Sequence, residues 1–143
     1  MTARLTTHDL SSALRVGVAR LSRRLRAEKA DDELSDTQTS ALAFVVREGP
    51  RTIGQLSEHE RVTPPSMNRT VNHLEAAGYI RRTPDPDDGR KVVVEVTDAG
   101  RALVTETRRR RDAWLHKRLR TLTPEQRATL AEAATILREL ADS

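Results

Sequence analysis

The spacing of the apolar residues changes abruptly at Gly78, and this change limits the folds open to the chain. In residues 63–77 the apolar side chains lie three or four positions apart, which is the period of an amphipathic helix. Residues 79–83 and 92–97 instead alternate as strands do, across a loop rich in proline, aspartate and glycine. The sequence therefore predicts a helix followed directly by a two-stranded hairpin.

Capping residues divide the rest of the chain into further helices. These are predicted over residues 8–30, after Ser35 as far as Gly49, after Thr52 as far as Glu60, from Asp98 to about Arg120, and after Thr123. Three short helices followed by a hairpin form a winged helix-turn-helix, so the predicted fold class is mainly α (α+β). Its predicted regions are an N-terminal dimerisation helix at 1–34, a DNA-binding lobe at 35–97 and C-terminal dimerisation helices at 98–143.

The flanking helices carry apolar stripes that a single helix cannot bury alone. We expect them to pack together and against a second copy of the chain. The predicted dimerisation residues are Leu10, Leu14, Leu21, Trp114, Leu130, Leu137 and Leu140. The stretch 105–112 is polar on all sides and is expected to be solvated. Its arginines, 108–111, are interpreted as a solvated run paired with Glu106 and Asp112, with a secondary phosphate contact as the alternative.

The helix at 63–77 has one side suited to reading DNA. Thr63 is its predicted N-cap, and two prolines take the first helical positions, where backbone N–H groups have no intrahelical partner. Opposite the apolar side, Asn68 or Asn72 could pair with adenine and Arg69 with guanine or a phosphate. Pro65 could contact a thymine methyl group. The alternative is an ordinary surface helix whose exposed side is polar by default.

The hairpin loop suggests a second contact with DNA. Asp88 could brace the guanidinium of Arg90, and a braced arginine at a wing tip suits a narrow minor groove. The alternative is a solvated turn with casual ion pairs. Arg81, Arg82 and Lys91 could reach phosphates. The full set of predicted DNA-binding residues is Thr63, Pro65, Ser66, Asn68, Arg69, Asn72, His73, Arg81, Arg82, Asp88, Arg90 and Lys91.

Composition narrows the possible functions further. Lys plus Arg number 25 against 21 Asp plus Glu, for a net charge of +4, and aromatic residues make up only 2%. Few aromatics argue against stacking on single-stranded nucleic acid, so duplex DNA is the expected partner. There is no cysteine, the histidines show no ligand spacing, and no catalytic constellation is visible. We expect no metal, cofactor or enzymatic activity, no membrane partner, and a cytoplasmic location.

Several short marks occur together in residues 52–100. They are Leu56, the entry at 62–64, the helix-to-strand junction at 74–80, the wing pair Asp88 and Arg90, and the closing pair Thr97 and Gly100. Their order and spacing resemble the winged helix of the MarR family of bacterial transcription regulators. The resemblance implies a homodimer that binds a pseudo-palindromic operator, with recognition helices in major grooves and wings at minor grooves. One departure is Gly89, where many members carry another arginine.

The resemblance also implies regulation by a small aromatic, acidic or lipophilic effector, bound between the DNA-binding lobe and the dimer helices. Candidate lining residues are His8, Arg15, Phe44 and Trp114, although Phe44 is better interpreted as a buried core aromatic and Trp114 as part of the dimer seam. Without cysteine, the thiol-oxidation switch of one branch of the family is excluded. Two other functions stay open: a winged-helix protein-interaction module, and an architectural DNA-binding protein without sequence preference.

Overall fold

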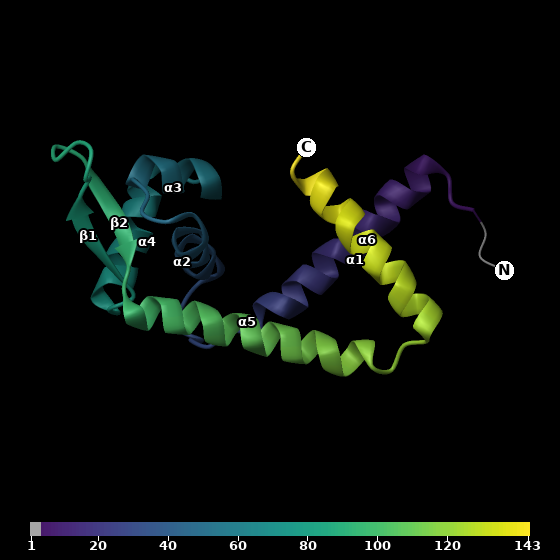
Figure 1. Cartoon of the computed structure of the whole chain (residues 1–143). Helices are drawn as coiled ribbons and strands as arrows, with labels where there is room; N and C mark the ends of the chain where they lie inside the picture. The colour runs from purple at the N-terminus through teal and green to yellow at the C-terminus, as the bar shows by residue number, and fades with distance from the viewer. Residues whose placement is uncertain (1–3) are drawn as a thin grey trace.

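The computed structural model describes residues 4–143 and confirms the predicted order of elements (Figure 1). These are α1 (Thr7–Arg26), α2 (Asp36–Glu48), α3 (Ile53–Glu60), α4 (Pro64–Ala76), β1 (Ile80–Pro84), β2 (Val92–Val96), α5 (Asp98–Leu119) and α6 (Pro124–Ala141). Helices α2 to α4 and the hairpin form a lobe at one end, and α5 runs from this lobe to the region where α1 and α6 cross (Figure 1). The expected region 1–34 includes residues 1–3, which lie outside the described residues.

The core of the lobe seats the recognition helix α4. Met67, Val71 and Leu74 are no more than 1% exposed and pack in one cluster with Leu42 and Leu56. The predicted apolar side of α4 is therefore confirmed. Ala77, one turn beyond Leu74, is exposed and forms the C-cap of the helix.

The cap predictions are also confirmed. Thr63 Oγ1 accepts a hydrogen bond from the backbone N–H of Ser66 at 3.3 Å, and Pro64 and Pro65 occupy the first two positions of α4. Prolines cost nothing at these positions and fix the direction in which the chain enters the helix. Helices α2, α3 and α6 each begin with a complete capping box.

The hairpin forms the wing. Strands β1 and β2 pair antiparallel, with Ile80 opposite Val96 and Pro84 opposite Val92. Strand β1 begins one residue later than expected because the N–H of Tyr79 still bonds to Leu74 O at the end of α4. A short bridge to Arg51 extends β2 on its other edge and joins the wing to the start of α3.

Two expectations for the long helices were wrong. Helix α1 ends at Arg26 rather than near residue 30, because the chain turns where Leu25 O accepts hydrogen bonds from Glu28 N and Arg111 Nε. The middle of α5 is not solvated all round. Thr107 is only 5% exposed, and its hydroxyl oxygen accepts a hydrogen bond from Ala30 N at 3.2 Å. The α1–α2 linker, residues 27–35, therefore covers one side of α5.

Helices α1 and α6 contain no buried residue. A groove between them is lined by Leu14, Val18, Leu137 and Leu140 together with polar residues of α1. The structure shows no helix within residues 4–143 that is long and apolar enough to cross a membrane.

Candidate nucleic-acid interface

The outer face of α4 carries the predicted base-reading residues. Pro65, Asn68, Arg69 and Asn72 are all exposed, on the side opposite the buried Met67. Asn68 Nδ2 donates to Pro64 O at 3.2 Å, which leaves its side-chain oxygen available. Within residues 4–143, no carboxylate forms an ion pair with Arg69, so its guanidinium is unneutralised. Thr63 and His73 are exposed at the two ends of this face, and Ser66 is half-buried beside it.

Strand β1 is tied to this face. Arg82 donates to Asn72 Oδ1 and to Glu75 Oε1, each at 2.7 Å, and its side chain is 28% exposed. Arg82 already occupies one of the two lone pairs of Oδ1, so a bidentate pair of Asn72 with adenine competes with this hydrogen bond. The ion pair with Glu75 also has to break before Arg82 can contact a phosphate.

The wing tip presents a single projecting arginine. Arg90 is braced as expected, with its Nε 3.3 Å and its backbone N–H 3.1 Å from Asp88 Oδ1, while its side chain is 93% exposed. Asp85 Oδ1 accepts from Asp87 N at 2.9 Å, so the loop aspartates close turns with their own backbone. Lys91 is exposed beside the tip, and Arg81 pairs with Glu95 at 3.2 Å.

The junction between α4 and the wing contains a pair that sequence reasoning missed. The hydroxyl of Tyr79 donates to Asp31 Oδ2 at 2.7 Å, across 48 positions of sequence. This hydrogen bond lowers the pKa of Asp31, aided by the N–H of Glu33, and it raises the pKa of Tyr79 with help from partial burial. The only signal in the sequence was a lone tyrosine where the helix meets the strand.

The run at 108–111 is more structural than expected. Arg109 and Arg110 both pair with Glu106, whose pKa they lower to about 2 by hydrogen bonding. Arg110 also donates to Lys29 O at 3.2 Å, and Arg111 donates to Leu25 O. No ion pair with the expected partner Asp112 forms among residues 4–143.

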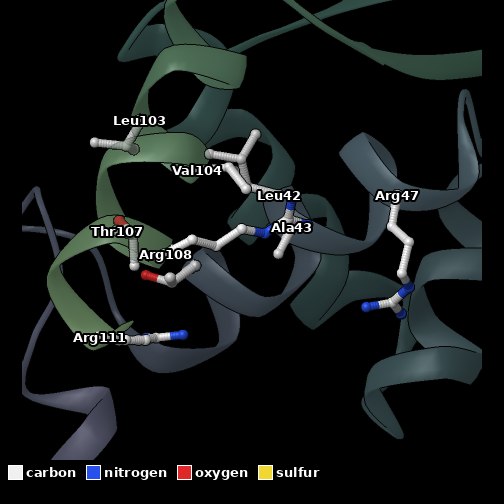
Figure 2. Close-up of a pocket in the computed structure, with 9 residues that line it drawn as sticks. Leu42, Ala43, Arg47, Leu103, Val104, Thr107, Arg108 and Arg111 are labelled. Carbon is white, nitrogen blue, oxygen red and sulfur yellow. The ribbon is translucent and has the colours of Figure 1, made fainter. Parts of the chain in front are cut away.

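A pocket of about 230 Å³ lies between α2 and α5, and Figure 2 shows side chains from both helices around it. Its lining consists of Thr39, Leu42, Ala43, Arg47, Leu103, Val104, Thr107, Arg108 and Arg111. Arg108 extends from α5 toward Ala43 on α2 (Figure 2). The site thus combines an apolar floor from the lobe core with three guanidinium groups.

The four lining candidates taken from the sequence lie elsewhere. Phe44 is partly rather than fully buried, packs against the core cluster of the lobe, and stacks on His59 with ring centroids 3.7 Å apart. Trp114 lies under the guanidinium groups of Arg24 and Arg118, and its Nε1 is buried with no hydrogen-bond partner within residues 4–143. Arg15 lines the groove between α1 and α6, and His8 is exposed at the start of α1.

Helix α4 has one side buried in the core and a polar outer face, and a two-stranded hairpin follows it. This arrangement defines a winged helix-turn-helix protein. Residues 33–91 match the model of the MarR family. An HTH-type transcriptional regulator of Mycobacterium leprae is 43% identical over 133 residues, 93% of each protein. The multiple antibiotic resistance protein MarR of Salmonella typhimurium is 30% identical over 99 residues, 68% of this chain and 69% of that protein. The structure of Streptococcus pneumoniae FabT in complex with DNA shares the fold, with a TM-score of 0.73, 21% identity and coverage of 94% and 98% of the two chains.

The chain belongs to the MarR family. It is a transcription regulator with a DNA-binding winged helix, since the family and its relatives are regulators and not enzymes.

Proposed function

We propose that this protein is a homodimeric repressor that binds a pseudo-palindromic operator and is released from it by a small ligand. The observation that carries the proposal is the outer face of α4, where Asn68 and Arg69 stand exposed on a helix whose opposite side is locked into the core. Amide and guanidinium groups on a rigid helix match the hydrogen-bonding edges of bases in a major groove.

In this proposal α4 reads the major groove and the wing contacts the minor groove. Arg90 projects from the tip with its guanidinium braced by Asp88, which suits the negative potential of a narrow minor groove. Arg81 and Lys91 then lie on strand and loop positions from which they reach phosphates. Phosphate contacts hold the protein in register, while the α4 side chains discriminate between sequences.

The apolar faces of α1 and α6 support the homodimer. Exposed side chains on these helices are Leu10, Leu14, Leu21, Leu130, Leu137 and Leu140, with exposed fractions of 38% to 58%. Burying a fully exposed leucine side chain contributes roughly 1.5–3 kcal/mol, and covering the part of these side chains that is still exposed contributes about half of that. A second copy placed on these faces by a two-fold axis covers both sets at once, which a single chain does not do.

The pocket between α2 and α5 supports control by a ligand. Arg47, Arg108 and Arg111 line the pocket beside its apolar side chains, and Arg108 extends into it without a carboxylate partner among residues 4–143, so the site fits a small anion with an aromatic or lipophilic body. Helix α5 runs from the lobe to the dimer helices (Figure 1). A ligand that binds more tightly to one arrangement of the lobe and the dimer helices than to another favours that arrangement. The resulting change in operator affinity is limited by the difference between the two ligand affinities.

Titrating salt in a DNA-binding assay tests the central proposal. The labelled probe is the intergenic duplex beside the gene for this chain, with random competitor duplex added. The regulator predicts strong preference for one site in this probe. Steep salt dependence without preference would indicate an architectural protein instead. If the protein bound no duplex even at low salt, both DNA-binding functions would be excluded and a protein-interaction module would be favoured.

The dimer and the ligand site have their own tests. Replacing Leu137 and Leu140 together by Glu is expected to give monomers in analytical ultracentrifugation, whereas the exposed change Glu132→Gln on the same helix should leave the dimer intact. For the pocket, benzoate is expected to weaken operator binding and benzamide, its uncharged match, to act much less. Equal effects of the two compounds would contradict an anion site.

A further inference from the structure

Tyr79, the residue between α4 and the wing, is fixed to its neighbours through its backbone. Its N–H donates to Leu74 O in the last turn of α4, and its carbonyl oxygen accepts from Thr97 N, each at 3.0 Å. Gly78 turns the chain with a φ of 84°, and Gly100 lies so close that a Cβ there would overlap the Tyr79 carbonyl. Any displacement of Tyr79 therefore displaces the end of the recognition helix.

The side chain of Tyr79 leads in the opposite direction, to the α1–α2 linker. Its hydroxyl donates to Asp31 Oδ2 at 2.7 Å, and Asp31 Oδ1 accepts from the backbone N–H of Glu33 at 2.9 Å. The carboxylate thus has one oxygen in its own linker and one on the wing junction. A hydrogen bond to a charged acceptor is stronger than one between neutral groups.

The linker is fixed to the dimer-forming part of the chain. Ala30 N donates to Thr107 Oγ1 at 3.2 Å, and Arg110 donates to Lys29 O at 3.2 Å. Arg111 binds the carbonyl of Leu25 at the end of α1. Among the side-chain hydrogen bonds of residues 4–143, the Asp31–Tyr79 bond alone joins this linker to the junction of α4 and β1.

We propose that the Asp31–Tyr79 hydrogen bond positions the recognition helix relative to the dimer helices and so sets the half-site spacing that an operator must have. The inference rests on the proposed dimeric binding of a two-fold operator. Two recognition helices must then enter major grooves about 34–36 Å apart. A lobe that loses this contact is held less firmly against α1 and α5, so a smaller fraction of dimers has both helices correctly placed.

Tyr79→Phe tests the proposal with the ring retained and the hydroxyl removed. The probe is a two-fold duplex selected from a random pool by the wild-type dimer, with derivatives that have one base pair added or removed between the half-sites. We expect the variant to bind the native duplex about tenfold more weakly, the effect of 1.4 kcal/mol. It should also lose most of the preference for native spacing, while its affinity for random duplex stays within about twofold of wild type.

Further variants separate positioning from a general loss of structure. Asp31→Ala should match Tyr79→Phe, Asp31→Asn should be intermediate because it keeps an acceptor, and the double variant Asp31→Ala/Tyr79→Phe should be no weaker than either single variant. Glu33→Gln is the matched control, since it removes a neighbouring charge and keeps the N–H that Asp31 uses. Thermal unfolding of each variant checks its fold.

The outcomes distinguish the two levels of the proposal. Wild-type protein without preference for any half-site spacing would overturn dimeric operator binding and this inference with it. A wild type with a clear preference that Tyr79→Phe and Asp31→Ala both retain would overturn only the positioning role, even if their affinity fell equally on every duplex.

Discussion

Arg82 Nη2 lies 2.7 Å from Asn72 Oδ1, and this hydrogen bond joins the first strand of the wing to the outer face of the recognition helix. The second guanidinium nitrogen binds Glu75, one turn further along α4. The proposed reader of bases and the proposed holder of phosphates are thus linked in the free protein. Their contributions to DNA binding should not be independent.

A double-mutant cycle measures this link. Arg82→Ala and Asn72→Ala are expected to show a coupling of about 1 kcal/mol in operator affinity, as is usual for residues in direct contact. The matched cycle pairs Asn72→Ala with Arg81→Ala, whose guanidinium binds Glu95 instead, and should be additive. Zero coupling in the first cycle would mean that the pair opens before DNA is bound.

Arg69 is expected to carry base discrimination, because it is exposed on α4 and no carboxylate within residues 4–143 neutralises it. Arg69→Ala should weaken operator binding by about 1–3 kcal/mol and relax preference at one base position. Binding to a set of singly substituted duplexes measures both effects. Arg120→Ala removes an exposed arginine near the α5–α6 turn and serves as control. A uniform loss over all duplexes would assign Arg69 to a phosphate.

Arg90→Ala tests the wing tip. The loss in affinity should be largest on operators with A·T-rich flanks, because a narrow minor groove attracts a cation most strongly. The slope of log affinity against log salt should fall by about 1. Lys91→Ala is expected to change the salt slope similarly but to act equally on all flanks. If Arg90→Ala weakened binding equally on all flanks, Arg90 would contact only a phosphate and not the minor groove.

The features that the sequence predicted correctly depend on residues that are close together in the chain. The apolar period places Met67, Val71 and Leu74 on one side of α4, and Thr63 with the two prolines marks where the helix starts. Each of these patterns involves residues within one or two helical turns. They also determine which side of α4 is exposed, so the candidate base-reading residues followed directly.

The missed features are contacts between distant segments. Arg111 binds Leu25 O across 86 positions at the early end of α1, and Ala30 of the linker that follows binds Thr107 and covers one side of α5. The arginine run at 108–111 resembles a solvated face in sequence, yet in the structure Arg110 and Arg111 donate to backbone carbonyls of Lys29 and Leu25. Hydrogen bonds of this kind depend on tertiary geometry, and no periodicity encodes them.

Two glycines give a matched test of packing at the wing junction. A Cβ at Gly100 would overlap the Tyr79 carbonyl oxygen and lie 2.9 Å from Val96 Cγ2, whereas a Cβ at Gly17 in α1 would meet no atom within 4 Å. Gly100→Ala should destabilise the fold by about 1–3 kcal/mol through overpacking. Gly17→Ala should stabilise it by roughly 0.5–1 kcal/mol through helix propensity. Denaturant unfolding measures both, and equal effects would contradict the close approach.

The Asp31–Tyr79 pair predicts how stability depends on pH. The pKa of Asp31 is lowered by the Tyr79 hydroxyl, so its contribution is present above the ordinary aspartate value near 4 and disappears as pH falls through the lower folded value. The pKa of Tyr79 is raised by the same bond, so that contribution is complete below about 10 and disappears as pH rises through the higher folded value.

The wild type should therefore exceed Tyr79→Phe in unfolding free energy throughout the range from about pH 5 to 9, where both groups keep their favoured states. Below about pH 4 and above about pH 10 the difference should shrink. Glu33→Gln, which keeps the pair intact, should follow the wild type. Urea unfolding at a series of pH values checks this, because comparison of variants cancels the titration of the other carboxylates. A difference that stays constant from pH 3 to 11 would contradict the link between folding and the ionisation of this pair, and no difference near pH 7 would show that the hydrogen bond contributes nothing to folding.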